Sequence, residues 1–245
     1  MSPDPELPHS RQFAAEIKFL LSPDQADAIH AGARRPMDPD PHGAGPFGDN
    51  YRTTSLYCDT PSFDVLHKRG SYGRGKYRIR VYGDGPTVFL ERKLRTGFLV
   101  GKRRTRVALP DVAALDAESP DSSFSGYWFH RRLRKRGLSP VCQIAYDRNA
   151  RVLESPSGPL RLTIDQRLRA CRADGFRFLP ADSMAAIVTR PILELKFRQA
   201  MPELFRRLVD EFGLLQSPVS KYRLAAARLG FPAPVAGRKE EALCA

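Results

Sequence analysis

Several segments of this chain alternate charged and apolar residues, which is the pattern of a β-strand with two unlike faces. In KYRIRVY, residues 76–82, Lys76, Arg78 and Arg80 fall on one face and apolar residues on the other. The segment GKRRTRV, residues 101–107, repeats this pattern with three further cations. Like charges side by side on a strand repel one another. The pattern therefore predicts strands whose charged faces look toward a common negative ligand.

A second pattern, Glu-x-Lys, occurs three times, at Glu16–Lys18, Glu91–Lys93 and Glu194–Lys196. Each pair places a carboxylate and an ammonium group on the same face of a strand. The same spacing predicts one shared face for Arg161, Thr163, Asp165 and Arg167. An ordinary sheet with one solvated face is the plain alternative, in which each exposed ion pair contributes under about 1 kcal/mol. The scarcity of uncharged polar residues on these faces, and the excess of cations, favour a charged interior instead.

The order of the segments predicts an α+β fold that is mainly antiparallel β. Eight strand-like segments occur, and the turns expected at 82–87 and 95–97 join antiparallel neighbours. Amphipathic helices expected at 22–34, 124–137 and 201–213 need an apolar surface to cover, which the outside of a barrel would provide. We therefore expect a closed eight-stranded β-barrel with a charged interior and helices packed outside.

The composition favours a polyanionic partner. The chain has 40 Lys and Arg against 27 Asp and Glu, for a formal net charge of +13. Its four cysteines are scattered without a C-x-x-C pair, which fits a reducing cytoplasm better than a zinc site or a disulfide framework. No signal-peptide core and no run near the roughly 18 apolar residues of a membrane span is present. We expect a cytoplasmic protein with one domain at 11–230, a disordered arm at 1–10 and a flexible tail at 231–245.

Seven short motifs resemble a known family. In chain order they are EIKF, TSLYCDTP, KYRIRVYG, FLERK, YDR, ILELKF and SKYRLA. Together, from about residue 13 to residue 230, they resemble the polyphosphate polymerase domain of the vacuolar transporter chaperone (VTC) family, within the triphosphate tunnel (CYTH-like) superfamily. The resemblance implies a β-barrel tunnel that transfers the γ-phosphate of ATP to a growing inorganic polyphosphate chain, with Mn²⁺ or Mg²⁺ as the divalent metal.

The resemblance also implies roles for individual residues. Those expected to act on the reacting phosphates are Arg78, Arg80, Lys93, Arg148 and Lys196. Further phosphate ligands would be Lys18, Lys76, Lys102, Arg104, Tyr146, Ser220 and Lys221, with Lys102 and Arg104 as alternative cations on the same face. Glu194 is the first choice as metal ligand, followed by Glu16, Glu91 and Asp165. Ala14 stands where the superfamily often has the first Glu of Glu-x-Glu-x-Lys, which favours a polymerase over a hydrolase.

Two alternatives stay open on the sequence. One is a triphosphate hydrolase or cyclase of the same fold, and the other is a non-catalytic module that binds polyphosphate or nucleic acid through the basic run at 130–137. A solvated helix face accounts for that run more simply, so no specific nucleic acid is expected. The histidines are expected to be surface residues without a catalytic role: His9, His30, His42, His67 and His130. The sequence leaves open the oligomeric state and whether a membrane partner receives the product.

Overall fold

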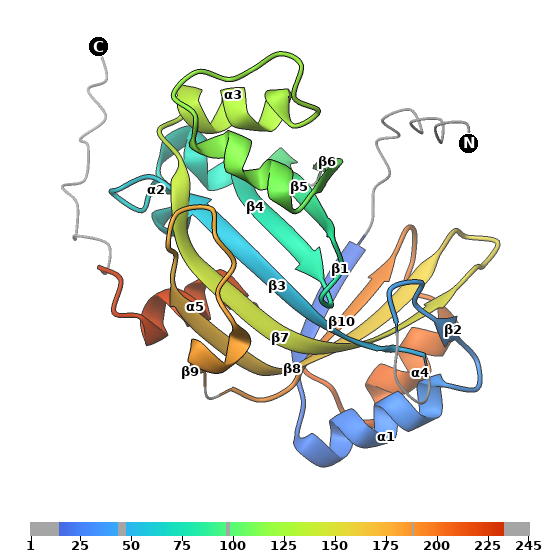
Figure 1. The fold of residues 1–245 in the computed structure, drawn as a ribbon. Coiled ribbons are helices and arrows are strands. Elements are labelled where there is room, and N and C mark those ends of the chain that lie inside the picture. The colour runs from blue at the N-terminus through green and yellow to red at the C-terminus, as the bar shows by residue number, and fades with distance from the viewer. Residues whose placement is uncertain (1–14, 44–47, 97–98, 188, 233–245) are drawn as a thin grey trace, which may run out of the picture.

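The structure is a computed structural model, and it describes residues 15–43, 48–96, 99–187 and 189–232. The expected N-terminal arm, Ala14 and the tail from residue 233 lie outside the described residues. One antiparallel sheet dominates the fold (Figure 1). Across the sheet, its eight main strands are β1 (Ala15–Leu20), β10 (Ile192–Phe197), β8 (Leu160–Arg172), β7 (Ser139–Leu153), β3 (Asn50–Asp59), β4 (Gly75–Tyr82), β5 (Thr87–Thr96) and β6 (Leu99–Ala108).

Shorter elements complete the fold. Two short strands extend the sheet, β2 (Asp38–Pro39) beside β7 and β9 (Ala185–Ala186) beside β8. The helices are α1 (Pro23–Ala33), α2 (Asp64–His67), α3 (Tyr127–Lys135), α4 (Glu203–Glu211) and α5 (Lys221–Arg228), with 3₁₀ turns η1 (Gly70–Arg74), η2 (Pro110–Asp116) and η3 (Ala181–Ser183). No helix in the described part of the chain is both long enough and apolar enough to cross a membrane.

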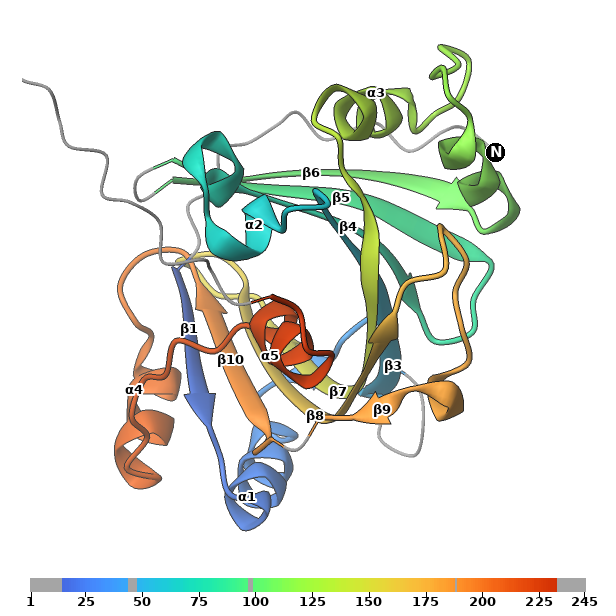
Figure 2. The ribbon, with the colours of Figure 1, turned by 90° about the vertical axis from the view of Figure 1, so that its left-hand side faces the viewer.

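The sheet is curled but open, so the expected closed barrel is wrong. β1 pairs only with β10, and β6 only with β5, which leaves both as edge strands of the described sheet. Figure 2 shows the sheet curling around a central space, with β1 and β6 on either side of the opening. The interior of a closed eight-stranded barrel is just wide enough for side chains. Here the concave side holds both the long cationic side chains and a helix, and the two edge strands are not paired with each other.

Three helices cover the convex face, as the sequence predicts. Ser22 caps α1 in a capping box with Gln25, whose side chain accepts from the Ser22 backbone N–H at 2.9 Å. α1 and α4 pack on β1 and β10, where Ile29 and Phe205 are buried in one apolar core. α3 packs on β4 and β5 and buries Phe129 in the other core. These helices remove the apolar strand face from water and leave the charged face on the concave side.

The helix α5 departs from the expectation that helices pack outside. It lies inside the curl of the sheet, against β7 and β8 (Figure 2). Tyr222 anchors it, since its ring stacks on Tyr57 at 5.4 Å and its hydroxyl donates to Asp59 at 2.6 Å. Ser220 caps the helix and accepts from the Arg223 backbone N–H. The N-terminus of α5 is thereby held on the concave side.

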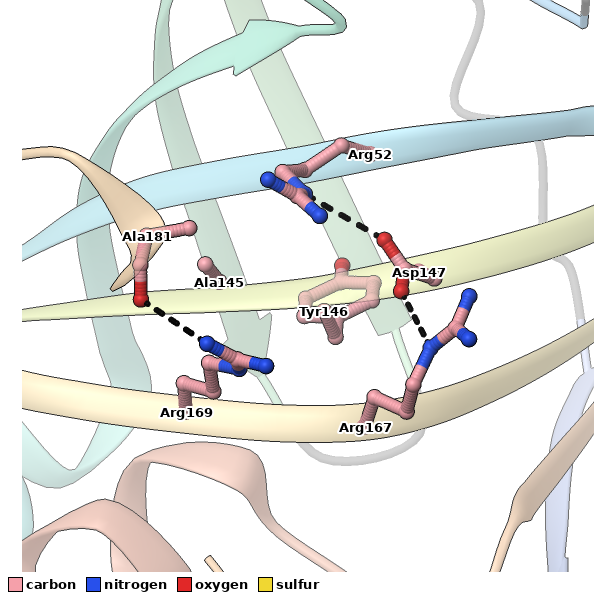
Figure 3. A pocket seen from close by; sticks show the side chains of 7 residues that line it. All are labelled: Arg52, Ala145, Tyr146, Asp147, Arg167, Arg169 and Ala181. Atoms are coloured by element: carbon pink, nitrogen blue, oxygen red, sulfur yellow. Dashed lines mark hydrogen bonds and ion pairs between the residues drawn. The ribbon is translucent and has the colours of Figure 1, made fainter. Parts of the chain in front are cut away.

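A β-bulge moves Arg167 away from its expected face. The pairing of β7 with β8 shifts register between Ala145 and Asp147, and Arg167 takes a positive φ of 51°. Its side chain therefore turns to the convex face, where its Nε donates to Asp147 at 2.6 Å (Figure 3). Arg52 donates to the same carboxylate from β3 at 3.3 Å. The predicted alternation holds through Asp165 and fails at the bulge, because one extra residue reverses the direction of every later side chain.

Candidate functional site

One side of the concave face is strongly cationic. We call the inward faces of β4, β5 and β6 the cationic wall; apart from Arg106, at its end beside Phe89, its charged residues are Lys76, Arg78, Arg80, Glu91, Lys93, Lys102 and Arg104. The single carboxylate, Glu91, is 2% exposed and lies 2.6 Å from Arg78 Nε, 3.1 Å from Lys102 Nζ and 3.3 Å from Arg104 Nε. Burial alone would raise the pKa of Glu91, but these cations hold it well below its ordinary value. One carboxylate thus faces six cations.

The opposite side carries both signs of charge. We call the inward faces of β1, β10 and β8 the mixed wall; its charged residues near the sheet opening are Glu16, Lys18, Glu194, Lys196 and Asp165. Lys18 Nζ lies 3.1 Å from Glu16 and 3.4 Å from Glu194, and Lys196 Nζ lies 2.7 Å from Glu194. Antiparallel pairing puts Lys18 opposite Glu194 and Glu16 opposite Lys196, so the repeated Glu-x-Lys pattern builds a square of alternating charges.

The neighbouring opposite charges in this square stabilise the ionised forms of Glu16 and Lys18. Burial and the neighbouring Glu194 raise the pKa of Glu16, but Lys196, Lys93 and Lys18 lower it to about 2. Burial lowers the pKa of Lys18, but the two glutamates raise it above its ordinary value. Both groups are therefore charged at neutral pH.

Residues from β7 and α5 lie between the two walls. Arg148 holds Asp165 in a two-pronged ion pair, from Nε at 2.6 Å and from Nη2 at 2.8 Å. Lys221 Nζ lies 2.6 Å from the same carboxylate, which is 0% exposed. The Tyr146 hydroxyl accepts from Arg80 Nη2 at 3.2 Å, and Ser220 Oγ lies 3.4 Å from Lys76 Nζ. The bulge that turns Arg167 outward leaves Asp165 and Arg148 directed inward.

All sixteen site residues predicted from the sequence lie on this concave side. Glu16 also joins the two walls, since its Oε2 lies 2.8 Å from Lys93 Nζ across the opening of the sheet. Ten of the sixteen are Lys or Arg and four are carboxylates. Burial lowers the pKa of Lys76, and the nearby cations Lys18, Lys93 and Arg78 lower it further. The site therefore has an uncompensated positive charge, which a polyanion would neutralise.

The sequence reasoning overlooked two tyrosines that share this face. Tyr57, from the TSLYCDTP motif, is buried among cations; burial raises its pKa, but Arg78, Arg80 and others outweigh that effect and lower it. Tyr82 follows Arg80 by two residues, and Arg80 and Arg104 lower its pKa to about 8 against the effect of burial. The period of two that placed Arg78 and Arg80 would have placed Tyr82 on the same face.

The carboxylates do not form one metal site. In the described part of the chain, no three His, Cys, Asp or Glu side chains lie close enough together to hold a metal ion. Glu91 and Asp165 are each held by two or more cations, as given above. Glu16 and Glu194 are also each paired with two or more lysines, but both lie close to the same ammonium group of Lys18, so the two carboxylates lie near each other. These two oxygen donors fit a divalent cation whose remaining ligands are phosphate oxygens and water.

The basic helix α3 lies away from this site, as do the described histidines other than His42. In α3, Arg134 donates to the Ala117 carbonyl at 2.7 Å and Arg136 to Ser71 at 3.1 Å, so part of the basic run is used locally. His130 is buried and lies 2.9 Å from the same carbonyl, which corrects the expectation of a surface residue. His42 is exposed at one end of the concave face. His9 lies outside the described residues.

Comparisons with known proteins show the fold of this chain and the family to which it belongs. A solved candidate adenylate cyclase from Bacillus halodurans is 14% identical, with a TM-score of 0.51, and the match covers 85% of this chain and 93% of that one. The sequence matches the VTC domain over residues 13–229, and the chain belongs to the VTC domain family. No curated protein matches the sequence.

Two further solved structures are similar to this chain. A candidate adenylyl cyclase from Hippeastrum, described as having a dominant triphosphatase activity, is 15% identical with a TM-score of 0.48, covering 87% of this chain and 95% of that one. A protein from Pyrococcus horikoshii is 13% identical with a TM-score of 0.49, covering 88% and 99%.

Proposed function

We propose that this protein is a polyphosphate polymerase that transfers the γ-phosphate of ATP to the end of an inorganic polyphosphate chain. The observation that carries the proposal is the charge of the concave face. Among the sixteen predicted residues there, ten are cations and four are carboxylates. A long chain of phosphates has the charge density and the length to neutralise such a surface. Membership of the VTC domain family supports the same reading.

The proposed reaction needs alignment and charge neutralisation rather than a side-chain nucleophile. An oxygen of the terminal phosphate on the acceptor chain forms the new bond to the γ-phosphorus of ATP. The bond between that phosphorus and the oxygen bridging to the β-phosphate breaks, which releases ADP. The attacking oxygen is already ionised, so no proton has to be removed by a general base.

The cationic wall would bind the transferred group. Arg80 is the clearest candidate, because its hydrogen bonds go to the hydroxyl groups of Ser55, at 2.9 Å, and of Tyr146 rather than to a carboxylate. Arg80 is only 4% exposed and has no carboxylate ion pair among the described residues, so it would bind phosphate oxygens that reach the inner surface of the wall. Arg78 and Lys102 share Glu91, and phosphate oxygens would compete with that carboxylate for them. Lys221 and Ser220 at the start of α5 would contact the chain from the other side.

The mixed wall would hold a divalent metal, Mn²⁺ or Mg²⁺, through Glu194 with Glu16 as its partner. Such an ion, when bound, neutralises charge on phosphate oxygens. Lys18 and Lys196 orient the two carboxylates by the contacts described above, and they remain close enough to bind phosphate themselves. We place the reaction in a reducing cytoplasm, which the free thiols of Cys58, Cys142 and Cys171 support.

The proposal is tested by incubating the purified protein with ATP and Mn²⁺ and separating the products by length. The expected result is long-chain polyphosphate together with ADP, both of which are lost in Arg80→Ala. Release of inorganic phosphate and ADP without polymer would replace the polymerase with a hydrolase of the same fold, and formation of pyrophosphate and a cyclic nucleotide would indicate a cyclase. Tight binding of polyphosphate without any turnover would indicate that the protein is a polyphosphate receptor and not an enzyme.

A further inference from the structure

The concave face ends, at the side away from α5, in a cluster of aromatic rings. We call it the aromatic patch; its members are His42, Tyr51, Tyr82 and Phe89. The His42 imidazole stacks on the Tyr82 ring, with centroids 4.4 Å apart and planes inclined by 19°. The rings of Tyr51 and Phe89 stand at an angle to Tyr82, with centroids 5.6 Å and 5.5 Å away.

The patch presents one exposed ring on a buried support. Tyr51 and Phe89 are buried and Tyr82 is half-buried, whereas His42 is exposed. The turn that carries His42 is fixed, because the His42 backbone N–H donates to Asp40 Oδ1 at 3.1 Å. Asp40 is itself held by Arg161 at 2.8 Å. The exposed His42 ring therefore covers the buried rings and leaves an aromatic surface open to a ligand.

The patch adjoins the phosphate-binding residues through Arg104. The Arg104 guanidinium lies 3.3 Å from Glu91 on the cationic wall, and its central carbon lies 3.4 Å from the centre of the Phe89 ring. Arg104 is also 5.5 Å from the centre of the Tyr82 ring. A ligand held by its phosphates on the cationic wall would therefore reach the patch with its other end. Inorganic polyphosphate has no group that stacks on aromatic rings, but a nucleobase does.

We propose that the aromatic patch is the nucleobase site of this protein, in which the base of a purine nucleotide stacks on His42 and Tyr82 while its phosphates extend past Arg104 onto the cationic wall. This inference rests on the proposed function in that both use the same wall for phosphates. It adds a direction: the nucleotide enters at the patch, and the end of the concave face beside α5 is left to the acceptor chain.

The test compares equilibrium binding of ATP and of inorganic tripolyphosphate to the full-length protein. In the double variant His42→Ala/Tyr82→Leu, the Kd for ATP should rise about tenfold, since stacking contributes roughly 1–3 kcal/mol per base. The Kd for tripolyphosphate should change less than about twofold, because every charged ligand on the cationic wall is retained and Tyr82 is only a neighbour of Arg80 and Arg104. The matched variant His42→Phe/Tyr82→Phe keeps both rings and should keep the affinity for ATP.

The remaining outcomes overturn the proposal. Equal weakening of both ligands by the double variant would mean that the patch only supports the wall. No change in the Kd for ATP would exclude the patch as well. The proposed polymerase activity fails separately, because a protein that binds ATP through the patch but makes no polymer still shows the difference between the two ligands.

Discussion

The two walls of the concave face differ in their balance of positive and negative charge. The cationic wall sets six cations against Glu91, whereas the mixed wall sets the carboxylates of Glu16, Glu194 and Asp165 against a similar number of lysines. Burial and mutual repulsion lower the pKa of Lys76 and of Lys102 on the first wall, but ion pairing raises that of Lys18 on the second. The cationic wall therefore has positive charge that an anionic ligand would neutralise, whereas the charges of the mixed wall already balance one another.

This difference assigns the walls separate tasks. An incompletely neutralised wall has cations, such as Arg80, that can bind an incoming anion without first leaving a carboxylate, and we propose that this wall binds the transferred phosphate. A balanced wall can exchange an ammonium ion for a metal ion, because its carboxylates are already ionised and oriented. The variants below test whether the two tasks are indeed separable.

The largest effect is expected for Arg80→Ala on the cationic wall. Removing one preorganised donor to a developing oxyanion costs up to about 10³ in rate, or about 4 kcal/mol. Polyphosphate formation from ATP should fall by that amount, and the binding of tripolyphosphate should weaken. Arg80→Lys should recover part of the loss. Arg131→Ala, on the exposed face of α3, is the control and should stay within about twofold of wild type; an equal loss there would show that general charge, not the wall, carries the effect.

The second effect separates the two walls by their glutamates. Glu194→Gln should weaken Mn²⁺ binding in the presence of tripolyphosphate roughly a hundredfold, as expected for loss of a charged ligand oxygen. Titration calorimetry measures this directly, without turnover. Glu91→Gln should leave Mn²⁺ affinity within about threefold, because Glu91 holds arginines and a lysine. If Glu91→Gln weakens the metal more than Glu194→Gln does, the metal belongs to the cationic wall and the assignment is wrong.

The sequence predicts these walls well because their pattern is local. The period of two along β4 places Lys76, Arg78 and Arg80 on one face without reference to the rest of the fold, and the same holds for each Glu-x-Lys pair. The capping box at Ser22 is equally local and is confirmed. Such features need only the conformation of a few neighbouring residues.

The errors concern relations between distant segments. Whether β1 pairs with β6 depends on the width of everything between them, so eight strands do not by themselves close a barrel. The outward turn of Arg167 depends on a register shift against β7, which its own strand does not encode. His130 sits on a basic helix whose sequence indicates exposure, yet the turn at Ala117 covers it. The aromatic patch was missed because His42 comes from a Pro- and Gly-rich loop with no periodicity.

The third effect is the uptake of protons when an anion binds, which should come from the cationic wall and not from the mixed wall. An anion on the cationic wall stabilises the charged forms of Lys76 and Lys102, whose pKa values lie below the ordinary 10.5, so it raises both pKa values. At an alkaline pH below the ordinary lysine value, where these two lysines are partly deprotonated in the free protein, binding of tripolyphosphate should therefore take up a fraction of a proton. Calorimetry in two buffers of different ionisation enthalpy measures the uptake.

The control for this proton balance lies on the other wall. Lys76→Met/Lys102→Met should abolish most of the uptake. Lys18→Met should leave most of it, since the raised pKa of Lys18 keeps that residue protonated at that pH and Lys18 is one of several cations that lower the pKa of Lys76. If proton uptake persists in Lys76→Met/Lys102→Met and disappears in Lys18→Met, the protons are taken up on the mixed wall and the comparison of the walls is wrong.

The smallest effect is expected where the two walls meet. Glu16 and Lys93 form a 2.8 Å ion pair across the open side of the sheet, and the Lys93 side chain is 44% exposed. A double-mutant cycle with Glu16→Gln and Lys93→Met should give a coupling free energy of unfolding under about 1 kcal/mol, as for other exposed pairs. Chemical denaturation of the four proteins measures it. The same cycle on the buried Arg148–Asp165 pair should give a larger value, since its partners are desolvated. A coupling at Glu16–Lys93 as large as that of the buried pair would mean that this contact, rather than the backbone pairing of the sheet, sets how far the two walls stand apart.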